Sequence, residues 1–152
     1  MKTIKIIESL LTSGALSSGG LRGCGSTEME KLFHHFGCVI PKEYADFMQI
    51  GGLSIGNLFI GTDIYYPRVL GLKSEASELM AENGVGELLA KNAIVFSLHQ
   101  GYEVNYMIPG SPDPVVWQYV EGAEKCVLGC ASFSEFLEEA IRAHLKENGT
   151  LD

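Results

Sequence analysis

The sequence predicts one α+β domain over residues 1–152, with a mainly antiparallel sheet of about five or six strands and helices packed on it. Apolar residues recur at helical spacing in the first third of the chain and again over residues 132–149. Short apolar runs at 93–98, 102–108 and 115–120 lie between them, at the close spacing of antiparallel hairpins. The sequence contains no internal repeat or interdomain linker, so one domain accounts for the whole chain.

A helix and a glycine-rich loop are predicted at the start of the chain. Ile4, Ile7 and Leu10 recur at helical spacing and predict a short amphipathic helix. The small residues of segment 12–25 predict a loop. Such a loop before a helix can hold phosphate, but this one lacks the Lys-Ser/Thr ending of a P-loop and no strand precedes it. We therefore favour a plain loop.

The second predicted helix has both a start and a stop signal. Thr27 and Glu30 have the spacing of a capping box, and Gly37 is a typical helix stop. The apolar face of this helix is predicted to contain Met29, Leu32, Phe33 and Phe36.

Residues 38–40 are predicted to connect this helix to a third one. Pro41 fits the first helical position, where its missing N–H costs nothing. Tyr44 and Phe47 belong to the apolar face. The pair Gly51-Gly52 ends the helix.

Strands dominate the prediction for the middle of the chain. Residues 58–60 form a short apolar run between glycines, and Ser74 can cap a helix that ends near residues 83–84. The runs 93–98 and 102–108 form a hairpin, with Gln100-Gly101 near its turn. Two further strands are expected at 115–120 and 126–128.

The closing helix has the clearest signal. Ser132 and Glu135 have capping-box spacing, and Asn148-Gly149 ends the helix. Its apolar residues follow at helical spacing: Phe133, Phe136, Leu137, Ala140, Ile141 and His144. This stripe is predicted to be core.

Composition narrows the functional class. A net charge of −8 argues against direct nucleic-acid binding, which depends on Lys and Arg, and permits a basic protein partner. The alternative is that the acidity only keeps the protein soluble. No apolar run approaches the ~18 residues of a membrane span, and Glu8 interrupts the N-terminal run before a signal peptide forms. We expect a cytoplasmic protein without membrane contact.

Side chains that carry chemistry in other proteins favour structural roles here. The cysteines fit reduced thiols without metal-ligand spacing, so we expect no disulfide, metal or cofactor. Near the hairpin turn, His99 and Glu103 could form a pair, but no nucleophile motif accompanies them, so we favour a hydrogen-bonded anchor and no enzyme activity. One residue of the pair His34-His35 is expected to pack on the apolar stripe of its helix. The four cysteines are Cys24, Cys38, Cys126 and Cys130.

The order of these motifs resembles the SUKH superfamily, which comprises the Smi/Knr-type regulators of fungi and bacterial toxin-immunity proteins. The match covers residues 26–145 approximately. Two departures are Ile50, where many members carry Asn, and a longer segment 62–91. The residues that carry the resemblance are Pro41, Tyr44, Phe47, Gly51, Gly52, His99, Gln100, Gly101, Tyr102, Trp117, Ser132 and Phe133.

The resemblance implies a non-catalytic protein-binding domain. Bacterial members are immunity partners of polymorphic toxins, often nucleases, and protect by occluding the toxin. A regulatory scaffold that binds signalling or cell-wall partners is the alternative. Because a nuclease presents a basic groove, the acidic residues expected to contribute to binding are Glu75, Glu78, Glu82 and Glu103. The alternative for the first three, which share one face of the predicted helix, is a face that is simply solvated.

Overall fold

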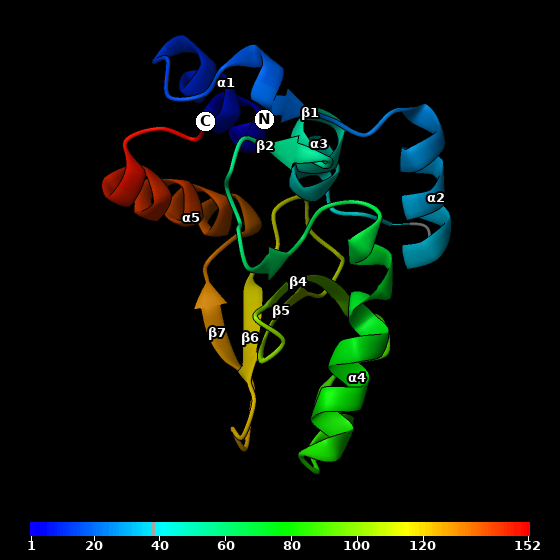
Figure 1. Cartoon of the computed structure of the whole chain (residues 1–152). Helices are drawn as coiled ribbons and strands as arrows, with labels where there is room; N and C mark the ends of the chain where they lie inside the picture. Colours follow the sequence, from blue (N-terminus) through cyan, green and yellow to red (C-terminus); the bar gives the residue numbers. More distant parts are fainter. Residues whose placement is uncertain (38) are drawn as a thin grey trace.

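Two antiparallel sheets organise the computed structural model, a main sheet of five strands in the order β3-β4-β5-β6-β7 and a small sheet made of β1 and β2 (Figure 1). The structure describes residues 1–37 and 39–152. The predicted α+β class is confirmed. The strands are β1 (Leu21–Arg22), β2 (Ser54–Ile55), β3 (Thr62–Asp63), β4 (Ile94–His99), β5 (Glu103–Met107), β6 (Val116–Val120) and β7 (Val127–Cys130).

Helices contribute most of the remaining structure. Within the described residues, no helix combines the length and the apolar character needed to cross a membrane. A 3₁₀ turn, η2 (Arg68–Gly71), leads directly into the fourth α-helix. The α-helices are α1 (Lys2–Thr12), α2 (Ser26–Phe36), α3 (Lys42–Gly51), α4 (Leu72–Glu82) and α5 (Phe133–Asn148).

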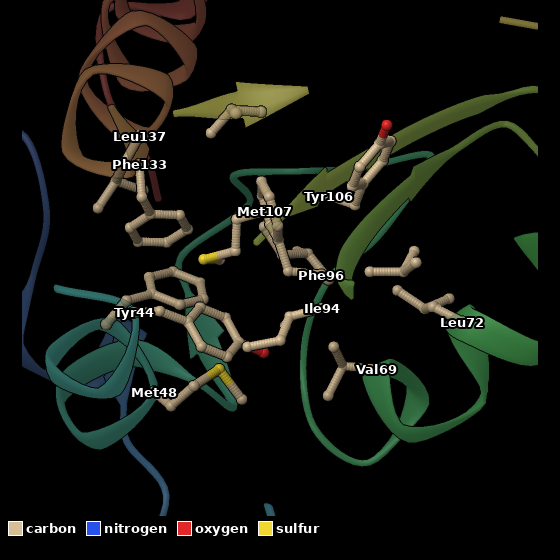
Figure 2. Close-up of a cluster of buried hydrophobic side chains, with 14 of the residues drawn as sticks. Tyr44, Met48, Val69, Leu72, Ile94, Phe96, Tyr106, Met107, Phe133 and Leu137 are labelled. Carbon is tan, nitrogen blue, oxygen red and sulfur yellow. The ribbon is translucent and has the colours of Figure 1, made fainter. Parts of the chain in front are cut away.

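The main sheet is covered on both faces at its centre. Every residue of β4 except His99 is buried, and so is every residue of β5 except Glu103, although successive side chains point to opposite faces. In Figure 2, Phe133 and Tyr44 lie on one side of Met107, and Leu72 of α4 lies on the other. Helices α3 and α5 therefore cover one face, and α4 packs along β4 on the other.

The core is centred on the ring of Phe133, at the start of α5. Its centroid lies 5.4 Å from Tyr44 and 5.8 Å from Phe47, both on α3. It also lies 5.2 Å from Phe96 on β4, in an edge-to-face contact. The predicted stripe of the closing helix is confirmed, since Phe133, Leu137 and Ile141 are buried.

A β-bulge directs Phe96 into this cluster. The register between β4 and β5 shifts between Val95 and Ser97, so Phe96 has no partner on β5. An extra residue in one strand bends the strand and re-aims a side chain. The insertion lets Phe96 reach α5 while Ser97 stays in register opposite Asn105.

The predicted end of α3 is confirmed, and both glycines are needed for close approach. A Cβ atom on Gly52 would lie 2.5 Å from the carbonyl oxygen of Met48 and 2.8 Å from the sulfur of Cys24. A Cβ atom on Gly51 would lie 2.6 Å from a side-chain carbon of Ile55. Neither position has room for a side chain, so the small sheet can pack against the end of α3.

Two helix starts differ from the prediction by a few residues. Helix α2 begins after Gly25, whose N–H donates to the Glu28 carboxylate at 2.8 Å, so the predicted Thr27–Glu30 cap is wrong. Helix α4 begins at Leu72, before the predicted cap Ser74, because η2 leads straight into it.

Two further residues, one in α2 and one before α3, lie elsewhere than predicted. Phe33 is 40% exposed and does not belong to the buried face of α2. Pro41 occupies the cap of α3, one position before the first helical residue. The predicted connection over 38–40 begins at Cys38, which lies outside the described residues.

The predicted strand over residues 58–60 is absent, and two-residue strands flank this segment instead. Phe59 adopts φ 67°, which turns the chain, and its ring stacks on Phe136 at 6.3 Å. Ile60 is 79% exposed. The predicted loop 12–25 also contributes a strand, β1, which pairs with β2.

We expect Phe133→Ala to lower the free energy of unfolding by ~3–5 kcal/mol, because the ring is fully buried and its loss leaves a cavity. Chemical denaturation monitored by circular dichroism measures the change. Phe33→Ala is the matched control and should cost less than about 0.5 kcal/mol, since Phe33 lies at the surface. A loss below about 1 kcal/mol for Phe133→Ala would contradict a central role for this ring.

Candidate binding surface

The structure separates the acidic residues that were predicted to bind a partner. Glu75, Glu78 and Glu82 lie on α4, as predicted. Glu103 lies at the start of β5 and accepts a hydrogen bond at 3.3 Å from the side-chain amide of Asn105. Asn105 faces α5. Because residues two apart on a strand share a face, Glu103 also lies on the face that α5 covers. The four residues therefore form two surfaces on opposite sides of the sheet.

The ridge on α4 is partly neutralised by a residue from the preceding turn. Arg68 of η2 donates to both carboxylate oxygens of Glu75, with Nη2 at 2.8 Å from Oε1. The same guanidinium lies 3.3 Å from the carboxylate of Asp63. The hydrogen bond from Arg68 lowers the pKa of Glu75. Glu78 and Glu82 are exposed and make no ion pair within the described chain.

A groove lies between α5 and the sheet, and we call it the α5 groove. One hollow of about 280 Å³ opens over β5, β6 and β7. A second hollow, of about 420 Å³, lies beside residues 57–60. Both reach Ala140, whose small side chain leaves space between the helix and the sheet. Polar residues of the groove are Asn57, His99, Asn105, Gln118, Glu139, His144, Glu147 and Asn148.

A polar row crosses the sheet at the groove. Ser97, Asn105 and Gln118 lie opposite one another on β4, β5 and β6. The Asn105 amide nitrogen lies 3.5 Å from Ser97 Oγ, and Gln118 Nε2 donates to Asn105 Oδ1 at 3.4 Å. Ser97 and Asn105 are buried, so these long bonds satisfy groups that water does not reach. Gln118 is half-buried and is the member of the row that lies nearest the opening of the groove.

His99 connects two strands. Its Nδ1 lies 2.7 Å from the hydroxyl of Thr62 on β3, which favours the interpretation as a hydrogen-bonded anchor. Glu103 lies opposite His99 in the ladder but bonds to Asn105, so the considered His99–Glu103 pair does not form. Gln100 and Gly101 adopt φ 48° and 76°, the left-handed geometry of a tight hairpin turn.

Other residues singled out in the sequence take structural or surface positions. The ring of Tyr102 lies 6.0 Å from His99, and Trp117 is half-buried on β6. The hydroxyl of Ser132 accepts the N–H of Glu135 at 3.1 Å and caps α5 as predicted. His34 and His35 are both exposed, so the expectation that one packs on the apolar stripe is wrong.

The α5 groove is electrostatically negative. Glu139 and Glu147 line it, and Glu103 bonds to its polar row. Among the described residues that line the two hollows there is no Lys or Arg. Unpaired carboxylates around a concave surface attract basic side chains of a partner. Sequence analysis missed Glu139 and Gln118 as groove residues. The signal available for Gln118 was the recurrence of polar residues on one face of two neighbouring strands.

The Cys130 thiol sits at the edge of the groove and donates to Oε2 of Glu139 at 3.3 Å. Burial and this hydrogen bond raise the pKa of Cys130 to about 12. Burial also raises the pKa of Cys24 to about 11. Within the part of the chain that the structure describes, no group of three or more His, Cys, Asp or Glu side chains is placed to hold a metal ion. Cys38 lies outside that part.

We expect Glu139→Gln to lower the pKa of Cys130 and to speed its alkylation at mildly alkaline pH. The thiolate is the reactive form, and each pKa unit changes its population about tenfold. Because burial is the larger cause of the shift, the rate should rise several-fold and remain below that of an exposed cysteine. Iodoacetamide labelling followed by peptide mass spectrometry measures the rate.

Glu138→Gln is the control for this experiment. Glu138 lies next to Glu139 but bonds to Arg142 at 2.6 Å, so its replacement should leave Cys130 unchanged. Equal labelling rates in all three proteins would show that Glu139 does not hold the thiol proton.

A family model described as the SMI1 / KNR4 family (SUKH-1) matches residues 23–139. The matched range contains the whole main sheet and helices α2, α3 and α4, and it ends within α5 at Glu139. A sequence search among curated proteins finds no match.

Proposed function

The chain belongs to the SMI1 / KNR4 family (SUKH-1), and on that premise we propose that it is a non-catalytic immunity protein that neutralises a cognate bacterial toxin by occluding it. The family match is the observation that carries the proposal, because it covers 23–139 and so most of the fold. The proposed place of action is the cytoplasm, where the toxin would otherwise act. A regulatory scaffold that binds signalling or cell-wall partners is the second candidate.

The charge of the α5 groove supports a nuclease as the toxin. A nuclease binds the phosphate backbone of its substrate through Lys and Arg. The carboxylates of Glu103 and Glu139 can take the place of phosphate oxygens against those cations. Net charge of −8 on the whole chain favours the same encounter and accelerates association.

The proposed absence of catalysis is supported by how the side chains are used. His99 bonds to Thr62 and holds β3 against β4. The polar row at the base of the groove bonds to itself rather than to a nucleophile. Occlusion requires only a stable surface complementary to the toxin, and the α5 groove is the surface proposed for this role.

Co-expression tests the proposal. The gene beside this one that encodes a large secreted toxin is expected to supply the partner, and its toxic domain should stop growth of a bacterial host when expressed alone. Co-expression of this chain should restore growth, and the two purified proteins should form a complex. Glu103→Gln/Glu139→Gln should weaken the rescue, because it removes groove charge while keeping side-chain size. Absence of both rescue and complex would overturn the immunity function, and a cell-wall partner captured instead would favour the scaffold.

The predicted role of the α4 ridge can be tested on the same complex. Glu78→Gln/Glu82→Gln is expected to lower the association rate about threefold and to reduce its dependence on salt, since surface charge acts mainly on encounter. Adding Glu75→Gln should change little further, because Arg68 already pairs with that carboxylate. Stopped-flow mixing at low and high ionic strength measures both quantities.

A matched double variant on other helices controls for net charge. Glu8→Gln/Glu30→Gln removes the same charge from exposed positions of α1 and α2. If the α4 variant and this control behave alike, the ridge contributes only through the total charge of the protein.

A further inference from the structure

The two edges of the main sheet differ. The edge strand β3 has only the two residues Thr62 and Asp63, and each side chain bonds to a neighbour, His99 or Arg68. The other edge strand, β7, spans Val127–Cys130. Among the described residues, the backbone of β7 makes no hydrogen bond outside its pairing with β6. One long edge therefore carries unpaired N–H and C=O groups.

This free edge is also apolar. Val127 is 46% exposed and Leu128 is 58% exposed. Natural sheets protect an exposed edge with Lys, Pro or very short strands. β7 contains neither residue type and is longer than β3, so it keeps the features that let a sheet accept another strand.

The two faces of β7 have different chemistry. Leu128 lies opposite Trp117, on the face away from α5, and forms a small apolar surface with it. Cys130 lies opposite Val116 on the groove face, beside Glu139 of α5. Glu135 lies one helical turn earlier and accepts the N–H of Ala131 at 3.1 Å. An added strand would thus have carboxylates on one side and hydrocarbon on the other.

We propose that β7 accepts an extended segment of the protein partner as an additional strand, with basic side chains toward the α5 groove and apolar side chains toward Leu128 and Trp117. This deepens the proposed function, since the partner is the toxin of that function. Main-chain hydrogen bonds give such an interface its affinity, and alternate side chains give its specificity. A second copy of this chain fits poorly, because pairing two β7 edges would bring Glu135 and Glu139 of both copies together and join two chains of net charge −8.

A short peptide of alternating Lys and Val is the probe that tests the chemistry without the toxin. It should bind the full chain in a fluorescence anisotropy titration, and a peptide with the same residues in two blocks should bind about tenfold more weakly, since it cannot present one residue type to each face. Hydrogen exchange of the bound protein should slow at the amides of Val127–Cys130. Equal binding of the two peptides, or unchanged exchange in β7, would overturn the proposal.

Variants of the edge give an independent readout. Val127→Lys/Leu128→Lys places one cation on the groove face, against the basic side chains, and one on the apolar face, and should weaken peptide binding by about tenfold. Phe33→Lys/Val39→Lys is the matched control, because it adds the same charge at two exposed apolar residues in and just after α2, a helix that lies far from β7 in Figure 1, and binding should be unchanged. Thermal unfolding confirms that the variants fold. Equal weakening by both substitutions would reduce the effect to net charge and contradict strand addition.

The toxin domain separates this inference from the proposed function. Suppose that the toxin domain binds, that Val127→Lys/Leu128→Lys does not weaken the complex, and that hydrogen exchange at β7 of the wild-type protein does not slow on binding. Strand addition is then wrong, and occlusion stands. If no toxin binds while the alternating peptide protects β7, the edge is a strand-binding site and the immunity function is wrong.

Discussion

The packing of Phe133 against three aromatic rings fixes the relative positions of the helices and the sheet. Tyr44 and Phe47 hold the ring to α3, and Phe96 holds it to β4. The start of α5 is fixed again by Asp113, whose Oδ1 accepts the N–H of Ser134 at 2.9 Å. A helix held at its first turn by both an apolar and a polar contact has little freedom to swing, so the rest of α5 projects in a set direction across the sheet.

That direction explains why a groove exists. The first turns of α5 bury large residues, Phe133 and Leu137, against the core. Farther along, the residue that faces the sheet is Ala140, and the sheet beneath it carries polar Asn105 and Gln118. The methyl group of Ala140 is too small to fill the space above the amides. Closing the space would bury more of the polar surface of the amides, which costs free energy. The groove is therefore a consequence of residue size and polarity rather than of a flexible loop.

Sequence reasoning succeeded where the signal is local. The capped helix from Ser132 and the hairpin with Gln100-Gly101 depend on neighbours a few residues away, and both are confirmed. It failed where distant partners decide the structure. The strands β1, β2 and β3 have two residues each and exist only through pairing with remote segments. Phe59 likewise departs from the predicted extended backbone, and its ring packs on Phe136 of the distant helix α5.

The inequality of the two sheet edges has a consequence for assembly. Antiparallel sheets with two open edges can polymerise, since each added chain offers a new edge to the next. Here the β3 edge is short, with its side chains engaged, while among the described residues the β7 edge is long and free. Two copies of this chain that met through β7 would each use their long edge and leave only the short β3 edges outside. Such a pair would be closed and would not extend into fibres through the main sheet.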